Sequence, residues 1–230
     1  MKSSLKKLVI ALAQLSPTYM LIFEGETEHG LVMAAIRENG GVEKFAVYPE
    51  YVTSPTQLYK ALNQVADFYD EVFVFFDDDG RDHLALTALF EKVKNFGNVR
   101  LAFSKPCFEV FVSYLLKHPK SYFSQAEGMP SPQAQLQDYV RSHAHDIFPG
   151  ESRIVGTSYR KGYDCGEKIW FSFSQNFESA LQFEKERQKK READPKCRLS
   201  TSDTACSTNA ASVLKRIIEV SNESSEDDCF

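Results

Sequence analysis

Two clusters of acidic residues stand where hydrophobic runs of the chain stop. Tyr19-Met-Leu-Ile-Phe23 leads into Glu24-Gly-Glu-Thr-Glu28, and Val72-Phe-Val-Phe-Phe76 leads into Asp77-Asp-Asp-Gly80. If both runs are strands of an open α/β sheet, their carboxyl ends meet at the edge where such sheets bind ligands. Carboxylates this close need a counter-charge, and a hard divalent cation supplies one while keeping coordination positions for water and phosphate. The pattern therefore predicts metal-dependent phosphodiester chemistry.

The acids are expected to differ in role. The glycine after Glu24 is expected to turn the chain sharply and to leave the Glu24 side chain exposed at the sheet edge. Alternate residues of an extended segment point the same way, so Asp77 and Asp79 are expected to share a cation while Asp78 points elsewhere. Glu109, in the first turn of a helix after another hydrophobic run, can bring a further carboxylate to this edge.

Each of these features also has a simpler explanation. Acids favour the first turn of a helix, so the first cluster and Glu109 could serve only the helix dipole, and the second cluster could be a capped turn. Arg81 and Lys105 lie near the strand ends and are candidates to bind phosphate, although such residues are more often surface charges. His143 and His145 are a poor metal pair, because residues two apart on a helix do not face each other.

The hydrophobic pattern places these clusters in alternating strands and helices. Strands are expected at 19–23, 45–48, 72–76 and 99–103. Ser54 and Pro55 supply the N-cap and the first residue of an intervening helix. The third run lacks alternation, as a central strand covered on both faces does. The sequence predicts an α/β fold with a parallel sheet flanked by helices.

The chain is expected to divide into three parts. Residues 1–118 hold the α/β pattern, residues 119–220 form a mostly helical extension, and residues 221–230 form a disordered acidic tail. Helices in the extension are expected at 133–142, 178–192 and 211–220. The second of these mixes basic with acidic residues, which favours a solvated face over a nucleic-acid patch.

Composition indicates a globular protein of 230 residues with 43% hydrophobic residues and a net charge of −5. From Glu219 onward there are five acids and no Lys or Arg, so residues 1–218 are neutral and a basic face stays open as an alternative. The five cysteines are odd in number and include no Cys-x-x-Cys pair, which indicates a reducing compartment. No apolar run reaches 18 residues, so we expect a cytoplasmic protein without a membrane span.

The acidic clusters resemble the Toprim catalytic domain, in which one strand ends in Glu-Gly and a later strand ends in Asp-x-Asp. Within that fold the chain is most similar to RloB-type proteins, through Glu24-Gly-Glu-Thr-Glu28, Phe76-Asp-Asp-Asp79 and Ser104-Lys-Pro-Cys-Phe-Glu109. The segments Tyr159-Arg-Lys161 and Ser207-Thr-Asn209 are similar to the closing segments of the family. The resemblance covers most of the chain.

The resemblance implies roles for single residues. Asp77 and Asp79 would bind Mg²⁺ or Mn²⁺, and Glu24 would act as general acid/base or as a further ligand. Glu28 and Glu109 would support a second metal. The chain departs from the family at two places. The first motif is one residue shorter, so either Glu26 or Glu28 can be its second acid. Phe111 stands where the family has a Trp. Lys161 joins Arg81 and Lys105 as a phosphate candidate.

The resemblance also implies a magnesium-dependent nuclease of bacterial or phage defence systems. It would act on DNA, RNA or tRNA beside an ATPase partner, with homo-oligomerisation left open. One alternative is a non-catalytic adaptor or toxin subunit of a defence complex. Another is a haloacid-dehalogenase-like phosphatase with Asp77 as nucleophile and Asp79 as acid/base. In that family the acidic motif follows the first strand, whereas here it follows two βα units.

Overall fold

The computed structural model describes residues 17–119, 130–142, 162–193 and 206–223. In these segments one sheet has the strand order β2-β1-β3-β4-β5. Its strands are β1 (Tyr19–Phe23), β2 (Phe45–Val47), β3 (Glu71–Asp77), β4 (Val99–Lys105) and β5 (Ser207–Thr208). The first four run parallel, and β5 pairs antiparallel with the end of β4. The predicted α/β fold is confirmed, and the short fifth strand was not expected.

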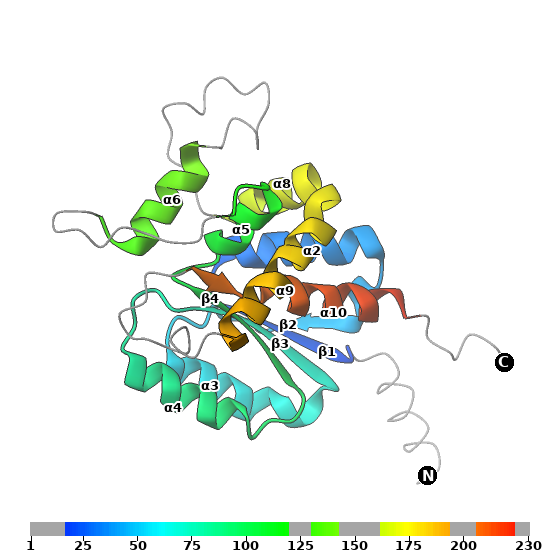
Figure 1. The fold of residues 1–230 in the computed structure, drawn as a ribbon. Helices are drawn as coiled ribbons and strands as arrows, with labels where there is room; N and C mark the ends of the chain where they lie inside the picture. The colour runs from blue at the N-terminus through cyan, green and yellow to red at the C-terminus, as the bar shows by residue number, and fades with distance from the viewer. Residues whose placement is uncertain (1–16, 120–129, 143–161, 194–205, 224–230) are drawn as a thin grey trace, which may run out of the picture.

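Helices cover both faces of this sheet (Figure 1). On one face lie α3 (Pro55–Val65) and α4 (His83–Val93). The other face carries α2 (Glu26–Asn39), α5 (Glu109–Leu115), α8 (Tyr163–Phe173), α9 (Phe177–Ala193) and α10 (Ala210–Asn222), while α6 (Pro132–Ser142) packs on α5. The described residues also include the short 3₁₀ turns η1 (Val42–Lys44), η2 (Ala66–Phe68) and η4 (Ser174–Asn176). The predicted cap is confirmed at α3, where Ser54 Oγ accepts a hydrogen bond from the Gln57 amide at 3.2 Å.

Strand alternation divides the core into two clusters, one on each face of the sheet. In β3, Phe73 and Phe75 belong to the cluster under α2 and α10, whereas Val74 and Phe76 belong to the cluster under α3 and α4. Every residue of β3 is buried, which confirms the central strand expected from its continuous hydrophobic run. By the same alternation, Asp77 follows Phe73 and Phe75 on the α2 face.

The C-terminal helices share a hydrophobic cluster with the strands. Ile169 of α8, Leu181 of α9 and Leu214 of α10 pack in the cluster that also holds Phe73 and Phe75. The last helix extends two residues beyond the predicted end at 220, to Asn222, and residues 224–230 of the predicted tail lie outside the described residues. Among the described helices, none is long and apolar enough to cross a membrane.

Candidate metal centre

Asp77 is the last residue of the central strand, and its carboxylate is buried. It is 4% exposed, and its Oδ2 accepts a hydrogen bond from the backbone N–H of Phe108 at 2.8 Å. Phe108 precedes α5, so this bond ties the end of β3 to the turn that follows β4. The structure thus fixes the carboxylate at the carboxyl edge of the sheet, where the sequence predicted it.

Glu28 is the acid of the first cluster that lies on the same face. It is 7% exposed in the first turn of α2, whereas Glu26 is exposed to solvent. Of the two candidates for the second acid of the first motif, Glu28 is therefore the buried one, and its role as a metal ligand stays a prediction. Its side chain folds back toward the start of the helix, close to Gly25.

Gly25 has a different role from the one predicted. Its φ of −141° and ψ of 169° are extended values that any residue adopts, so no glycine is needed for a sharp turn. What Gly25 provides is space, since a Cβ at this position would lie 2.8 Å from Oε2 of Glu28. The missing side chain leaves a cradle for the Glu28 carboxylate.

Glu109 brings a third carboxylate to this face from the first residue of α5. It is 2% exposed, and its charge is among those that raise the pKa of Asp77. The prediction that a further acid reaches the edge from the turn after β4 is confirmed. Helix-dipole stabilisation alone does not account for a carboxylate buried beside another carboxylate.

Glu24 directly follows β1. By strand alternation, its side chain starts from the face of the sheet opposite to that of Asp77. Its side chain is only 10% exposed, so the predicted exposed position is wrong. Its Oε2 accepts a hydrogen bond from the Asp77 backbone N–H at 2.7 Å, and its Oε1 forms an ion pair with Arg81. Glu24 is therefore adjacent to Asp77, but its carboxylate already has a cationic partner.

Arg81 is held in place by oxygen atoms of four residues. Besides Glu24, its guanidinium donates to the carbonyl of Asp77 and to the carbonyl of Thr53, the latter at 3.1 Å, and Oδ2 of Asp79 lies 3.8 Å away. The guanidinium carbon stands 4.6 Å from the centre of the Phe76 ring. In this structure the Arg81 guanidinium contacts protein oxygens, and its predicted role in phosphate binding stays a prediction.

Asp79 does not continue the extended strand, contrary to the expectation that it would pair with Asp77. Its φ is +48°, in the left-handed region, and β3 ends at Asp77. Alternation therefore stops before Asp79, whose side chain is 30% exposed on the Arg81 side. Asp78 closes the turn, its Oδ1 accepting from the Gly80 N–H at 2.9 Å.

The electrostatics follow from this grouping. Burial, followed by the charges of Glu28, Glu24 and Glu109, raises the pKa of Asp77 well above its ordinary value, against the lowering effect of the Phe108 N–H. Burial also raises the pKa of Glu24, although its bonds to Asp77 and Arg81 oppose the shift. A charged Asp77 is thus costly unless a cation compensates it.

The donor chemistry suits a hard cation. All the donors are carboxylate oxygens, they come from three elements, and Gly25 leaves room for one of them. Within the residues that the structure covers, however, no three His, Cys, Asp or Glu side chains are arranged to hold a metal ion. A bound Mg²⁺ or Mn²⁺ therefore stays a prediction, and it requires side-chain movement.

Two other predicted residues are placed as follows. Lys105 is the last residue of β4, half-buried, and it precedes the cis peptide bond to Pro106. Lys161, together with His143 and His145, lies outside the described residues.

Glu184 belongs to the helix that was expected to have a solvated face, but it is buried. It accepts hydrogen bonds from the backbone N–H groups of Ala211 at 2.8 Å and Ser212 at 3.0 Å.

Sequence reasoning missed an aromatic group beside the first cluster. The His29 ring stacks on Phe23 with centroids 4.7 Å apart, and its Nδ1 lies 3.1 Å from the Tyr51 hydroxyl. Tyr163 of α8 meets His29 edge to face at 4.9 Å. Burial lowers the pKa of His29, which favours the neutral ring. Helical spacing of Tyr163, Gly166, Ile169 and Trp170 could have indicated α8.

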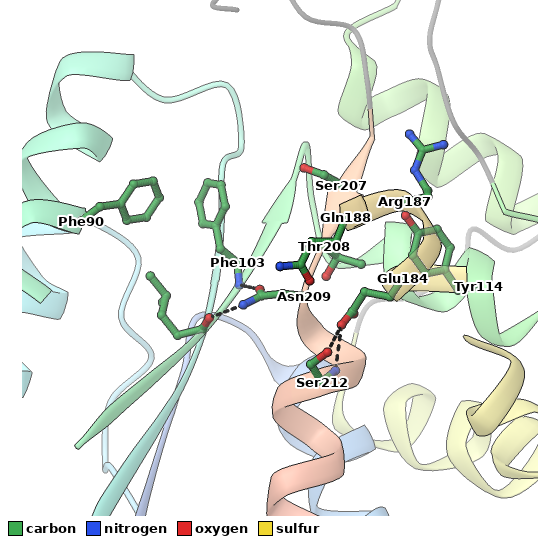
Figure 2. Close-up of a pocket in the computed structure, with 11 residues that line it drawn as sticks. Phe90, Phe103, Tyr114, Glu184, Arg187, Gln188, Ser207, Thr208, Asn209 and Ser212 are labelled. Carbon is green, nitrogen blue, oxygen red and sulfur yellow. Dashed lines mark hydrogen bonds between the residues drawn. The ribbon is translucent and has the colours of Figure 1, made fainter. Parts of the chain in front are cut away.

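A cavity of about 580 Å³ lies between α4, the edge of β4 and α9 (Figure 2). Asn209 lines this cavity, and its side-chain amide donates to the Leu101 carbonyl at 2.8 Å and accepts from the Phe103 N–H at 2.6 Å. The amide thereby satisfies part of the open edge of β4 in the manner of a neighbouring strand. None of the predicted site residues lines this cavity.

Comparison of the chain with protein families, with curated proteins and with solved structures finds no match.

Proposed function

We propose that this chain is a metal-dependent nuclease that hydrolyses phosphodiester bonds of nucleic acid. The observation that carries the proposal is the burial of the Asp77 carboxylate within electrostatic reach of Glu28, Glu24 and Glu109 at the carboxyl ends of parallel strands. A fold has little reason to collect four acids around one strand end unless a cation compensates them. The resemblance to Toprim proteins of the RloB type supports the same activity.

Asp77, Glu28 and Glu109 are the residues that would hold Mg²⁺ or Mn²⁺, with Glu24 adjacent. When bound, such an ion screens the phosphate charge and makes a water molecule more acidic. The chain itself contributes orientation, because the Phe108 N–H fixes Asp77 and the space at Gly25 admits Glu28. Glu24, whose pKa is raised by burial, is the adjacent group that would accept a proton.

The phosphatase alternative gains less support from this geometry. It needs Asp77 as an accessible nucleophile and Asp79 beside it as acid/base. Asp77 is 4% exposed, and the left-handed Asp79 stands on the Arg81 side of the turn. The adaptor alternative needs no chemistry at all, and an activity assay separates it from the nuclease.

The test is cleavage of plasmid DNA, single-stranded oligonucleotides and tRNA in Mg²⁺, in Mn²⁺ and in a chelator. The wild type is expected to cleave at least one substrate only with metal, and Asp77→Asn is expected to lose more than about a hundredfold of that rate. Asp78→Asn is the matched control, since Asn keeps the oxygen that accepts from Gly80, and it should retain activity.

Two other results would change the assignment. Turnover of a small phosphoester, with every nucleic acid left intact, would favour the phosphatase. Inactivity on all substrates would favour an adaptor or toxin subunit. As a nuclease, the protein is proposed to act in the cytoplasm. The family resemblance implies a defence system and an ATPase partner.

A further inference from the structure

Arg81 occupies the position at which a cation would meet Glu24. Its guanidinium is bonded to the Glu24 carboxylate and to two backbone carbonyls, of Asp77 and Thr53. Carboxylate and carbonyl oxygens are also the ligands that a hard divalent cation takes. The structure therefore shows an internal cation already seated among oxygens at the edge of the carboxylate group.

The same contact occupies the carboxylate of Glu24. Glu24 and Asp77 are linked through a 2.7 Å hydrogen bond, yet it runs from the Asp77 backbone N–H, and the other oxygen of Glu24 faces Arg81. The Arg81 guanidinium is further fixed by the Phe76 ring, whose centre lies 4.6 Å from the guanidinium carbon. The Glu24 oxygen that faces Arg81 cannot at the same time face the other three acids, which are Asp77, Glu28 and Glu109.

We propose that Arg81 is an internal counter-ion that competes with a divalent cation for Glu24. The site has two arrangements, one with Glu24 on Arg81 and one with Glu24 turned to the metal. A cation that binds must release Arg81 from Glu24, and the apparent affinity for the metal is reduced by the strength of that ion pair. This inference rests on the proposed function, because it concerns the same metal site.

The test is Mn²⁺ binding, measured by calorimetry on the full chain and therefore independent of catalysis. Arg81→Ala is expected to lower the dissociation constant for Mn²⁺ about tenfold, because one charge-assisted contact no longer competes. Arg81→Lys keeps the positive charge, but an ammonium group cannot contact all three acceptors as the guanidinium does. A gain in affinity smaller than that of Arg81→Ala is therefore expected. An unchanged or weakened affinity in both variants would overturn the inference.

A double-mutant cycle separates competition for Glu24 from a general charge effect. In a Glu24→Gln background, Arg81→Ala should change the Mn²⁺ dissociation constant by less than about threefold. An equal gain in both backgrounds would overturn the inference, since it would show that removal of a positive charge suffices. Arg100→Ala is the matched control, because Arg100 bonds Glu71 at the opposite end of β3 and should leave Mn²⁺ binding unchanged.

A measurement on the wild type covers the case in which Arg81 variants do not fold. Mg²⁺ is titrated into protein with ¹⁵N-labelled arginine, and the Arg81 side-chain resonance is expected to shift in step with metal saturation. A resonance that stays unchanged at saturating Mg²⁺ would overturn the inference alone. Failure of the wild type and of all variants to bind Mn²⁺ would remove the proposed function together with it.

Discussion

Asp77 carries a carboxylate that is 4% exposed and accepts a backbone hydrogen bond from Phe108. Burial and three neighbouring acids raise its pKa well above the ordinary value. The folded protein therefore retains a proton there at pH values where the unfolded chain, with a pKa near 3.8, has lost it. Stability from this group is greatest at low pH and declines as the pH rises from about 4 toward the raised value.

Asp77→Asn is accordingly expected to stabilise the metal-free protein at neutral pH. The amide oxygen can still accept from Phe108, and no charge is buried, so we expect the free energy of unfolding to rise by about 1–2 kcal/mol. Denaturant unfolding at several pH values without divalent metal measures this. The difference between variant and wild type should grow from pH 4 upward, and a difference that is absent or shrinks with pH would refute the electrostatic account.

Gly25→Ala tests the cradle for Glu28. The backbone at Gly25 is extended, so Ala fits without strain, but its Cβ would stand 2.8 Å from the Glu28 carboxylate. We expect a loss of Mn²⁺ affinity of about tenfold, with stability changed by less than about 1 kcal/mol. Gly97→Ala is the control, because nothing lies within 4 Å of a Cβ there. Equal Mn²⁺ affinities in the two variants would contradict the role given to Gly25.

Sequence patterns located the acids but not their partners. The ends of two hydrophobic runs sufficed to place Glu24, Glu28 and Asp77 at one edge, because parallel strands align their carboxyl ends. The pairing of Asp77 with Asp79 was wrong because the strand stops at Asp77 and a left-handed residue follows. That turn is held by the Ser104 and Pro106 carbonyls, which are distant in sequence.

Helices α2 and α8 are the elements on which the first acidic cluster depends. A Cβ at Gly166 of α8 would lie 2.1 Å from the Thr27 carbonyl, and a Cβ at Gly30 of α2 would lie 2.0 Å from the Tyr163 carbonyl. The Thr27 hydroxyl also accepts from the Gly162 N–H at 3.2 Å. The first turn of α2, which carries Glu28, is thus packed directly on the C-terminal part of the chain.

Gly166→Ala is expected to force these helices apart. Backbone atoms cannot yield as a flexible side chain can, so we expect a loss of about 2–4 kcal/mol in the free energy of unfolding, measured with denaturant. Metal binding should weaken as well, since Glu28 moves with α2. A variant as stable as Gly97→Ala would show that the close packing of α2 on α8 contributes little.

The strands and the helices between them could be predicted from hydrophobic runs and caps, because those signals are local. The strand β5 could not, since two residues carry no period and their pairing depends on β4. The burial of Glu184 was also missed. It depends on the N-terminus of α10, whose free N–H groups attract a carboxylate from α9, and no spacing within 178–192 reveals that contact.

At the scale of the whole molecule, the predicted extension completes the α2 face of the sheet. Ala210, Leu214 and Ile217 of α10 are fully buried in the cluster that contains Leu21 and Phe73. A fragment 1–118 would leave that apolar surface in water. We expect it to lack the cooperative unfolding transition of the full chain in circular dichroism. A fragment with a cooperative transition would instead support an independent α/β domain.

The nuclease proposal depends on the binding of a divalent cation by the buried acids at the strand ends. Calorimetric titration of Mn²⁺ into the wild type and into Asp77→Asn measures this binding. We expect saturable binding to the wild type and a loss of at least about tenfold in affinity for the variant, because Asp77 is central to the ligand group. If the wild type does not bind Mn²⁺, or if the two proteins bind it equally well, the buried acids are not a metal site.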